Sequence, residues 1–108
     1  MKLITKELEK RFKEVGSQEN TKLGEQIVIA KLFNPTGRGT WFLTEYDPET
    51  KIAFGFVSLF GDYNDEWGDF AVWELEEFKG QFGLGIERDI FFTEKKAKEI
   101  ELVAKSLK

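Results

Sequence analysis

The chain contains no cysteine and no histidine. Without cysteine it can form no disulfide and offers no thiolate, and residence in the cytoplasm is compatible with that lack. Without histidine it lacks the side chain most used for proton transfer near neutral pH, and the usual Cys/His zinc sites are excluded. An enzyme would have to work with Asp, Glu, Lys, Arg, Tyr, Ser or Thr. We therefore favour a protein without catalytic activity, and we expect no cofactor.

Long apolar runs are also missing. No stretch approaches the roughly 18 apolar residues that a membrane-spanning helix needs, and the opening residues, MKLITKELEKRF, lack the uninterrupted apolar core of a signal peptide. Methionine occurs once, whereas there are eleven phenylalanines and three tryptophans. Because aromatic side chains bury large areas, few residues can fill the core of the single domain, residues 1–108, that this length predicts. We expect a cytoplasmic protein without membrane association.

Positive charge is absent from one long stretch. Residues 61–78 carry seven acidic groups and no lysine or arginine, and residues 27–79 hold ten acidic and four basic groups. The segments on either side are close to balance, so the net charge of −4 arises in the middle of the chain. An acidic surface repels phosphate backbones, so direct nucleic-acid binding is not expected, although basic groups of the terminal helices could still cluster.

The first half of the chain predicts a helix followed by three strands. Apolar residues recur at helical spacing between Thr5, a plausible N-cap, and Gly16, a natural stop. Three apolar segments of strand length follow, separated by the turn sequences NPTGRG and DPET. Because the turns are short, the strands should form an antiparallel meander. These strands are predicted over residues 26–33, 40–46 and 51–60.

The second half predicts a short helix, a strand and a final helix. Asp69 is a plausible N-cap for a helix that ends at Gly80, and residues 86–92 have the composition of a fourth strand. Thr93 is then placed to cap a last helix over residues 94–107. The order α-β-β-β-α-β-α predicts an α+β domain in which the terminal helices pack on an antiparallel sheet of about four strands.

Three segments of the chain, NPTGRGTWFLTEYDPETKIAFGFV, DEWGDFAVWELEEF and GLGIERDIFF, together resemble the bacterial and phage family known as domain of unknown function 2958. The resemblance covers nearly the whole chain. It implies an accessory protein of a plasmid, conjugative element or prophage, and it supplies no catalytic residue. The chain departs from the family pattern at Ala71, where serine or threonine is common, and at Tyr63 and Asn64, which look like extra length.

The segment GDYNDEWGDF, residues 61–70, holds four carboxylates and can be compared with a calcium loop. An EF-hand requires Gly at its sixth position and Glu at its twelfth. A loop that starts at Asp62 has Trp67 and Trp73 at these positions, so the EF-hand interpretation fails. A looser cation site remains open, as does a solvated acidic turn at the N-terminus of the following helix. We assign no metal ligand; the looser site would use Asp62, Asp65, Glu66 and Asp69.

Trp67 lies among the polar residues of this acidic segment. Tryptophan and tyrosine are favoured at protein interfaces, so Trp67 could anchor a protein partner. Its indole could equally fold back over the sheet edge and cover the core. The candidate partner-binding residues are Trp41, Tyr46, Asp62, Tyr63, Asp65 and Trp67.

Arg88 stands between two acidic residues in the predicted fourth strand. Alternation places it on the same face as Ile86 and Ile90, the expected core side, where a buried arginine should be paired. One interpretation is an ion pair with Glu66 that joins the acidic segment to the sheet; the other is an arginine that binds a ligand carboxylate or phosphate. The ligand candidates are Arg38, Glu66 and Arg88, of which Arg38 lies between two glycines in a turn.

These features predict a small binding protein rather than an enzyme. Its partner is expected to be a basic protein surface, such as the nucleic-acid channel of a host enzyme, engaged through the acidic and aromatic segment. Interference with a host system is the role that this setting suggests. The alternative is a small-molecule or nucleotide binder, or a carboxylate-metal hydrolase, with Arg88 and Glu66 in its pocket.

Overall fold

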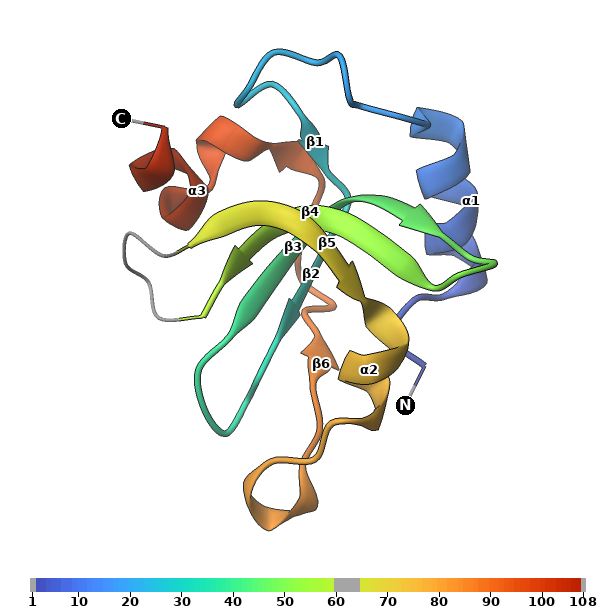
Figure 1. Cartoon of the computed structure of the whole chain (residues 1–108), viewed down its shortest axis with the longest axis vertical. Helices are drawn as coiled ribbons and strands as arrows, with labels where there is room; N and C mark the ends of the chain where they lie inside the picture. The colour runs from blue at the N-terminus through green and yellow to red at the C-terminus, as the bar shows by residue number, and fades with distance from the viewer. Residues whose placement is uncertain (1, 60–64, 108) are drawn as a thin grey trace.

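A five-stranded antiparallel sheet forms the centre of the fold (Figure 1). The computed structural model describes residues 2–59 and 65–107. The strand order is β5-β4-β3-β2-β6, and a separate two-stranded ribbon pairs β1 with β7. The predicted α+β class is confirmed, and the main sheet has one strand more than expected. The elements are α1 (Lys6–Val15), β1 (Ile27–Val28), β2 (Ala30–Phe33), β3 (Thr40–Asp47), β4 (Ile52–Ser58), β5 (Glu66–Ala71), α2 (Val72–Glu77), η1 (Gln81–Gly83), β6 (Glu87–Arg88), β7 (Lys95–Lys96), η2 (Ala97–Glu99) and α3 (Glu101–Ser106).

Helix α1 begins and ends where the sequence predicts. The Thr5 hydroxyl accepts a hydrogen bond from the backbone amide three residues further on, at 3.2 Å, and Gly16 closes the helix with a φ of 70°. The helix packs on one face of the sheet, on which it buries Phe12. The residues just before it belong to the core as well, since Leu3 and Ile4 are 0% and 1% exposed.

The three central strands form the predicted meander. β3 pairs antiparallel with β2 on one side and with β4 on the other. The apolar run over residues 26–33 is divided at Ile29, because residues 27–28 pair with β7 in the ribbon and residues 30–33 join the main sheet. The run therefore contributes to both layers of core, with Val28 on one side and Ala30 on the other.

Residues 66–71 form a strand where the sequence predicts an acidic turn and the start of a helix. This strand, β5, pairs with β4 along its whole length. Asp and Gly have weak strand preference, but β propensity depends on context, and pairing with β4 outweighs it here. Asp69 thus lies inside the strand, and the predicted Asp69 cap is wrong. The N-cap of α2 is Ala71, whose side chain makes no capping hydrogen bond.

The predicted strand over residues 86–92 is wrong beyond Arg88. Only Glu87–Arg88 pair with β2. The chain then turns at Asp89, whose carboxylate accepts a hydrogen bond from the Phe91 amide at 3.0 Å. Such a local hydrogen bond competes with the ladder and ends the strand. Ile90, expected in the core, is consequently 70% exposed.

The last helix is shorter than predicted. β7 and η2 occupy residues 95–99, and α3 starts only at Glu101. Thr93 therefore caps no helix. Pairing of β7 with β1 holds this segment extended before the helix begins.

Both faces of the main sheet are covered, by different elements. α1, α2 and the residues before α1 cover the first face, whereas η2 and α3 cover part of the second face. Alternation along β3 sends Trp41 and Leu43 to the first face and Phe42 to the second. The sheet is therefore the middle layer. Besides these, the buried residues of the first face include Leu3, Ile4, Phe12, Leu32, Ala53, Val72 and Ile86, and those of the second face are Val28, Phe56, Ala97 and Val103.

A β-bulge interrupts the pairing of β3 with β4, where the register shifts between Leu43 and Glu45. Next to the bulge, a Cβ at Gly55 would collide with the backbone carbonyl of Phe42. Glycine in a strand commonly marks such a close backbone approach. Any larger residue at this position would push β3 and β4 apart.

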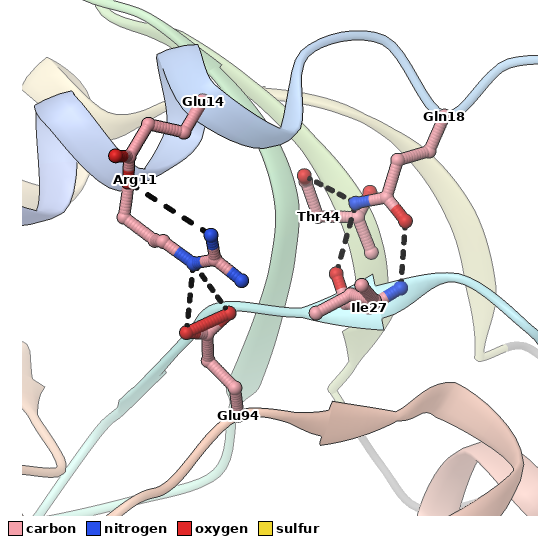
Figure 2. Close-up of polar contacts among 6 residues, drawn as sticks. All are labelled: Arg11, Glu14, Gln18, Ile27, Thr44 and Glu94. Atoms are coloured by element: carbon pink, nitrogen blue, oxygen red, sulfur yellow. Dashed lines mark hydrogen bonds and ion pairs between the residues drawn. The ribbon is translucent and has the colours of Figure 1, made fainter.

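The Gln18 side chain connects the bulge to the ribbon (Figure 2). Its Nε2 donates to the carbonyls of Thr44 and Ile27, both at 2.9 Å, and its Oε1 accepts from the Ile27 amide at 2.6 Å. A bulged residue is left out of the ladder, and buried backbone groups need partners. Gln18, itself only 7% exposed, supplies the donor that the Thr44 carbonyl requires.

Glu25 ties the segment before β1 to the C-terminal part of the chain. Its carboxylate lies 2.7 Å from Lys98 Nζ and 2.9 Å from Lys96 Nζ. The hydrogen bond from Lys98, followed by that from Lys96, lowers the pKa of Glu25 from 4.5 to about 2. This double contact supports the β1–β7 pairing.

Gly55→Ala is expected to lower the free energy of unfolding by about 3 kcal/mol or more, because the strands must separate to admit a methyl group. Gly68→Ala is the matched control, since a Cβ at that position of β5 meets no atom within 4 Å, and its effect should stay within about 0.5 kcal/mol. Urea unfolding followed by tryptophan fluorescence measures both. Equal midpoints for the two variants would contradict a steric role of Gly55.

Gln18→Met is expected to cost about 2–4 kcal/mol of stability, because it leaves one buried and two partly buried backbone groups without partners. Gln81→Met, at an exposed position, is the control and should be close to neutral. Thermal unfolding measures the loss, and hydrogen exchange should show faster exchange of the Ile27 amide. An unchanged exchange rate at Ile27 would refute this role of Gln18.

A pH titration should show the Glu25 carboxylate ionising with a midpoint of about 2. Because the pKa is lowered in the folded state, the resulting stability is present above the ordinary value of 4.5 and is lost as the pH falls toward 2. Lys98→Met should raise the midpoint, whereas Lys79→Met, at an exposed position, should not. Carbon-detected NMR of the glutamate carboxyl groups gives the values, and a midpoint unmoved by Lys98→Met would contradict the assignment.

Candidate functional site

Strand β5 forms one edge of the main sheet (Figure 1). Residue pairs in an antiparallel ladder alternate between hydrogen-bonded and non-hydrogen-bonded pairs. The Val72 amide donates to the Lys51 carbonyl at 2.9 Å, which identifies Lys51 and Val72 as a hydrogen-bonded pair. Counted from this pair along the register, every second pair of β4 with β5 is therefore also hydrogen-bonded. The β5 residues in those pairs, which point their backbone groups at β4, are Glu66, Gly68 and Phe70.

The intervening residues, Trp67 and Asp69, point their backbone N–H and C=O groups away from β4. No other strand of residues 2–59 and 65–107 pairs with this side of β5. An edge strand in this state is a template on which another chain can pair.

Exposed carboxylates continue from this edge into the helix that follows it. Glu66 and Asp69 of β5 are exposed and lie three positions apart, so their side chains point to opposite faces of the sheet. α2 adds exposed Glu74 and Glu77. None of the four forms an ion pair with a lysine or arginine of the described residues. We call these four residues, together with the outward backbone of β5, the acidic edge.

Trp67 covers the second face of the sheet. Its indole stacks on Phe54 with ring centroids 6.2 Å apart and meets Phe56 edge-on at 5.5 Å. Of the two sequence interpretations, the structure agrees with an indole that folds back over the sheet edge. Its Nε1 is buried and has no hydrogen-bond partner in the described part of the chain.

Asp65 immediately precedes the acidic edge. One of its carboxylate oxygens accepts a hydrogen bond from the Ser58 hydroxyl at 2.8 Å, which joins the start of β5 to the end of β4. The other carboxylate oxygen is buried and has no partner within the described chain. Asp62 and Tyr63 lie outside the described residues.

The two remaining aromatic candidates lie elsewhere on the sheet. Trp41 is 8% exposed and belongs to the core of the first face, so it presents little surface to a partner. Tyr46 is half-buried and packs against Phe12 with ring centroids 5.8 Å apart. Burial, and then the charges of Glu76, Glu9 and Asp47, raise the pKa of Tyr46. Trp41 lies apart from the acidic edge, because β3 lies two strands away from β5. Tyr46, in contrast, lines an open depression of about 1100 Å³ together with Asp69.

Arg88 does not contact Glu66, and the predicted ion pair between them is wrong. Arg88 lies in β6 and Glu66 in β5, at opposite edges of the sheet. Arg88 Nη1 donates instead to the Leu3 carbonyl at 2.6 Å, and the Leu3 amide donates to the Glu76 carboxylate at 2.8 Å. Arg88 and Glu76 thus hold the residues that precede α1. Arg38, the third ligand candidate, is exposed in the turn between β2 and β3.

A shallow depression of about 380 Å³ lies beside Arg88, between α1 and the turn after β6. Arg11 also lines it, but Arg11 Nε donates to both oxygens of Glu94 at 2.9 Å (Figure 2). Asp89 and Glu94 at the same depression carry negative charge. The two arginines therefore face carboxylates that would compete with an anionic ligand.

Two exposed aromatic side chains are not among the residues predicted from the sequence. Phe82 in η1 is 92% exposed and has a φ of 61°, and Phe91 in the turn after β6 is 87% exposed. The glycines on either side of Phe82 indicate a loop, and Asp89 two residues before Phe91 indicates a turn. These signals could have placed both residues at the surface.

Within residues 2–59 and 65–107, no three acidic side chains converge closely enough to hold a metal ion. Within the same residues, no helix combines the length and the apolar character needed to cross a membrane.

The chain matches a known protein family. A family model described as "Protein of unknown function (DUF2958)" matches residues 3–102, nearly the whole chain. No curated protein and no solved structure matches the chain. The match agrees with the resemblance carried by the three sequence segments.

Proposed function

The chain belongs to the family described as proteins of unknown function DUF2958, and we propose that it is a non-enzymatic binding protein of a mobile genetic element or phage. In this proposal it engages a basic protein partner through the acidic edge. The supporting observation is the run of exposed carboxylates along β5 and α2, none of which forms an ion pair with a lysine or arginine of the described residues.

Charge complementarity is the physical reason for a basic partner. Residues 61–78 contain seven acidic groups and no basic group. An acidic surface, formed here by Glu66, Asp69, Glu74 and Glu77, speeds encounter with a positive surface and disfavours acidic partners. On the second face, the Trp67 indole packs on Phe54 and Phe56 of β4. This packing holds the backbone between Glu66 and Asp69 against β4.

Interference with a host system is the proposed setting. Mobile elements act inside a host cell, and the proposed site of action is the cytoplasm. A basic surface there that is essential to the host is the nucleic-acid channel of an enzyme, which an acidic protein can occupy in place of phosphates. This role follows from the resemblance of the sequence and from the charge of the edge.

A second candidate is a small-molecule or nucleotide binder that uses the depression beside Arg88. The observation in its favour is that Arg11 and Arg88 line the same 380 Å³ depression. Glu66 takes no part, since it lies at the opposite edge of the sheet. Calorimetric titration with nucleotides separates the two candidates, because heat that Arg88→Met abolishes would favour the ligand binder.

Neutralising the acidic edge is expected to abolish capture of the partner. The test variant is Glu66→Gln/Asp69→Asn/Glu74→Gln/Glu77→Gln, and the control is Glu7→Gln/Glu19→Gln/Glu49→Gln/Glu101→Gln, which removes four exposed carboxylates elsewhere. Quantitative pull-downs from a bacterial host should retain basic proteins on the wild type and the control but not on the test variant. Retention should fall with salt because the contact is ionic.

A pull-down in which the test variant keeps the same proteins as the wild type would overturn the proposed site. Nothing above background on any of the three proteins would overturn the proposed function. Circular dichroism of each variant confirms that the fold is intact before binding is compared.

A further inference from the structure

We propose that the partner contributes an extended segment that adds as a sixth strand to β5 and carries two basic residues three positions apart. This inference rests on the proposed function, because it describes how the acidic edge recognises its partner. Three features carry it: the outward backbone of β5, the placement of its two carboxylates and the open space at Gly68.

The backbone of β5 offers a short ladder. Trp67 and Asp69 each direct one N–H and one C=O away from β4, and Ala71, in the same kind of pair with Ile52, adds an outward N–H before α2 begins. Strand addition to an exposed edge obtains its affinity from such main-chain hydrogen bonds and its specificity from alternate side chains. A segment of about five residues spans this ladder.

The two carboxylates of β5 set the spacing of the basic residues. Side chains that lie opposite one another in paired strands share a face of the sheet, and opposite charges stabilise the pair. Glu66 and Asp69 lie on opposite faces, so a partner strand needs one basic residue on each face. Residues three apart in a strand satisfy this requirement, whereas residues two apart lie on the same face.

The surroundings of the two carboxylates suit lysine or arginine. A Cβ at Gly68, between them, would meet no atom within 4 Å, so a partner side chain can cross the edge at this position. Trp67 lies on the same face as Asp69 and is only partly buried. The aliphatic stem of a lysine opposite Asp69 can therefore pack against the indole while its ammonium group reaches the carboxylate.

A second copy of the chain fits this edge poorly. Antiparallel pairing of two β5 strands would bring both copies of Glu66 and Asp69 into one short ladder. Each copy also carries a net charge of −4. Like charges at an edge oppose such pairing, which is a common protection against aggregation. A basic segment removes this repulsion and is the occupant that the charges favour.

The test uses two peptides of identical composition. Acetyl-TVKTVKTV-amide has lysines three apart, and acetyl-TVKTKVTV-amide has them two apart. Calorimetric titration of the full chain should give about 1.5- to fivefold tighter binding of the first peptide, as expected for one extra cross-strand charge pair. Glu66→Gln or Asp69→Asn should remove the difference, whereas Glu49→Gln, at an exposed position outside the edge, should preserve it.

Backbone pairing is tested separately from charge. Two versions of the first peptide are N-methylated, one at alternate odd positions and one at alternate even positions. Strand addition predicts that one version binds and the other does not, because only one set of amides faces β5. In hydrogen exchange, the unmodified peptide should slow exchange of the Trp67 and Asp69 amides and leave that of Gly68 unchanged.

Several results would overturn strand addition. They are equal affinity for the two lysine spacings, indifference to both methylation patterns, absence of binding at millimolar peptide, and dimerisation of the free chain through β5 in sedimentation analysis. The proposed function would survive these results if the pull-down still depended on the acidic edge. If the pull-down also retains no protein above background, the proposed function is contradicted as well.

Discussion

The β-bulge at Thr44 is the constraint on which the rest of the structure depends. It brings the Phe42 carbonyl so close to β4 that only glycine fits at position 55. The carbonyl that it frees is bound by the Gln18 amide, which also holds both backbone groups of Ile27. The bulge thereby determines where β1 lies, and β1 in turn pairs with β7 and leads η2 and α3 onto the second face. One irregularity in β3 thus positions the outer layers relative to the sheet.

Those parts of the fold that depend on local chemistry could be predicted. The Thr5 cap, the Gly16 stop and the two turns of the meander follow from side chains that act on their neighbours in sequence. β5 could not be predicted in this way, because its Asp and Gly residues have weak strand preference and its stability comes from pairing with β4. The exposure of Ile90 was missed for a related reason: alternation predicts a face, but not how soon a strand ends.

The candidate site, too, has one part that the sequence predicts and another that it does not. The sequence located the acidic patch, because a run without basic residues is visible in the chain itself. It did not place Glu66 and Arg88 correctly, since strand order joins residues far apart in sequence and puts these two at opposite edges. Residues 66–71 form an edge strand in place of the predicted acidic turn, and this changes what the segment can bind. A turn offers only carboxylates, whereas an edge strand also offers ordered backbone donors and acceptors with a defined spacing.

The hydrogen bonds at Leu3 have a consequence for how the chain is made. This residue joins partners 73 and 85 positions further along the sequence, Glu76 and Arg88. At translation rates of about 5–20 residues per second, Arg88 is synthesised roughly 4–17 s after Leu3. During that interval the two backbone groups of Leu3 lack the partners that they have in the folded domain. These hydrogen bonds, which hold the residues before α1, can therefore form only after β6 has been synthesised.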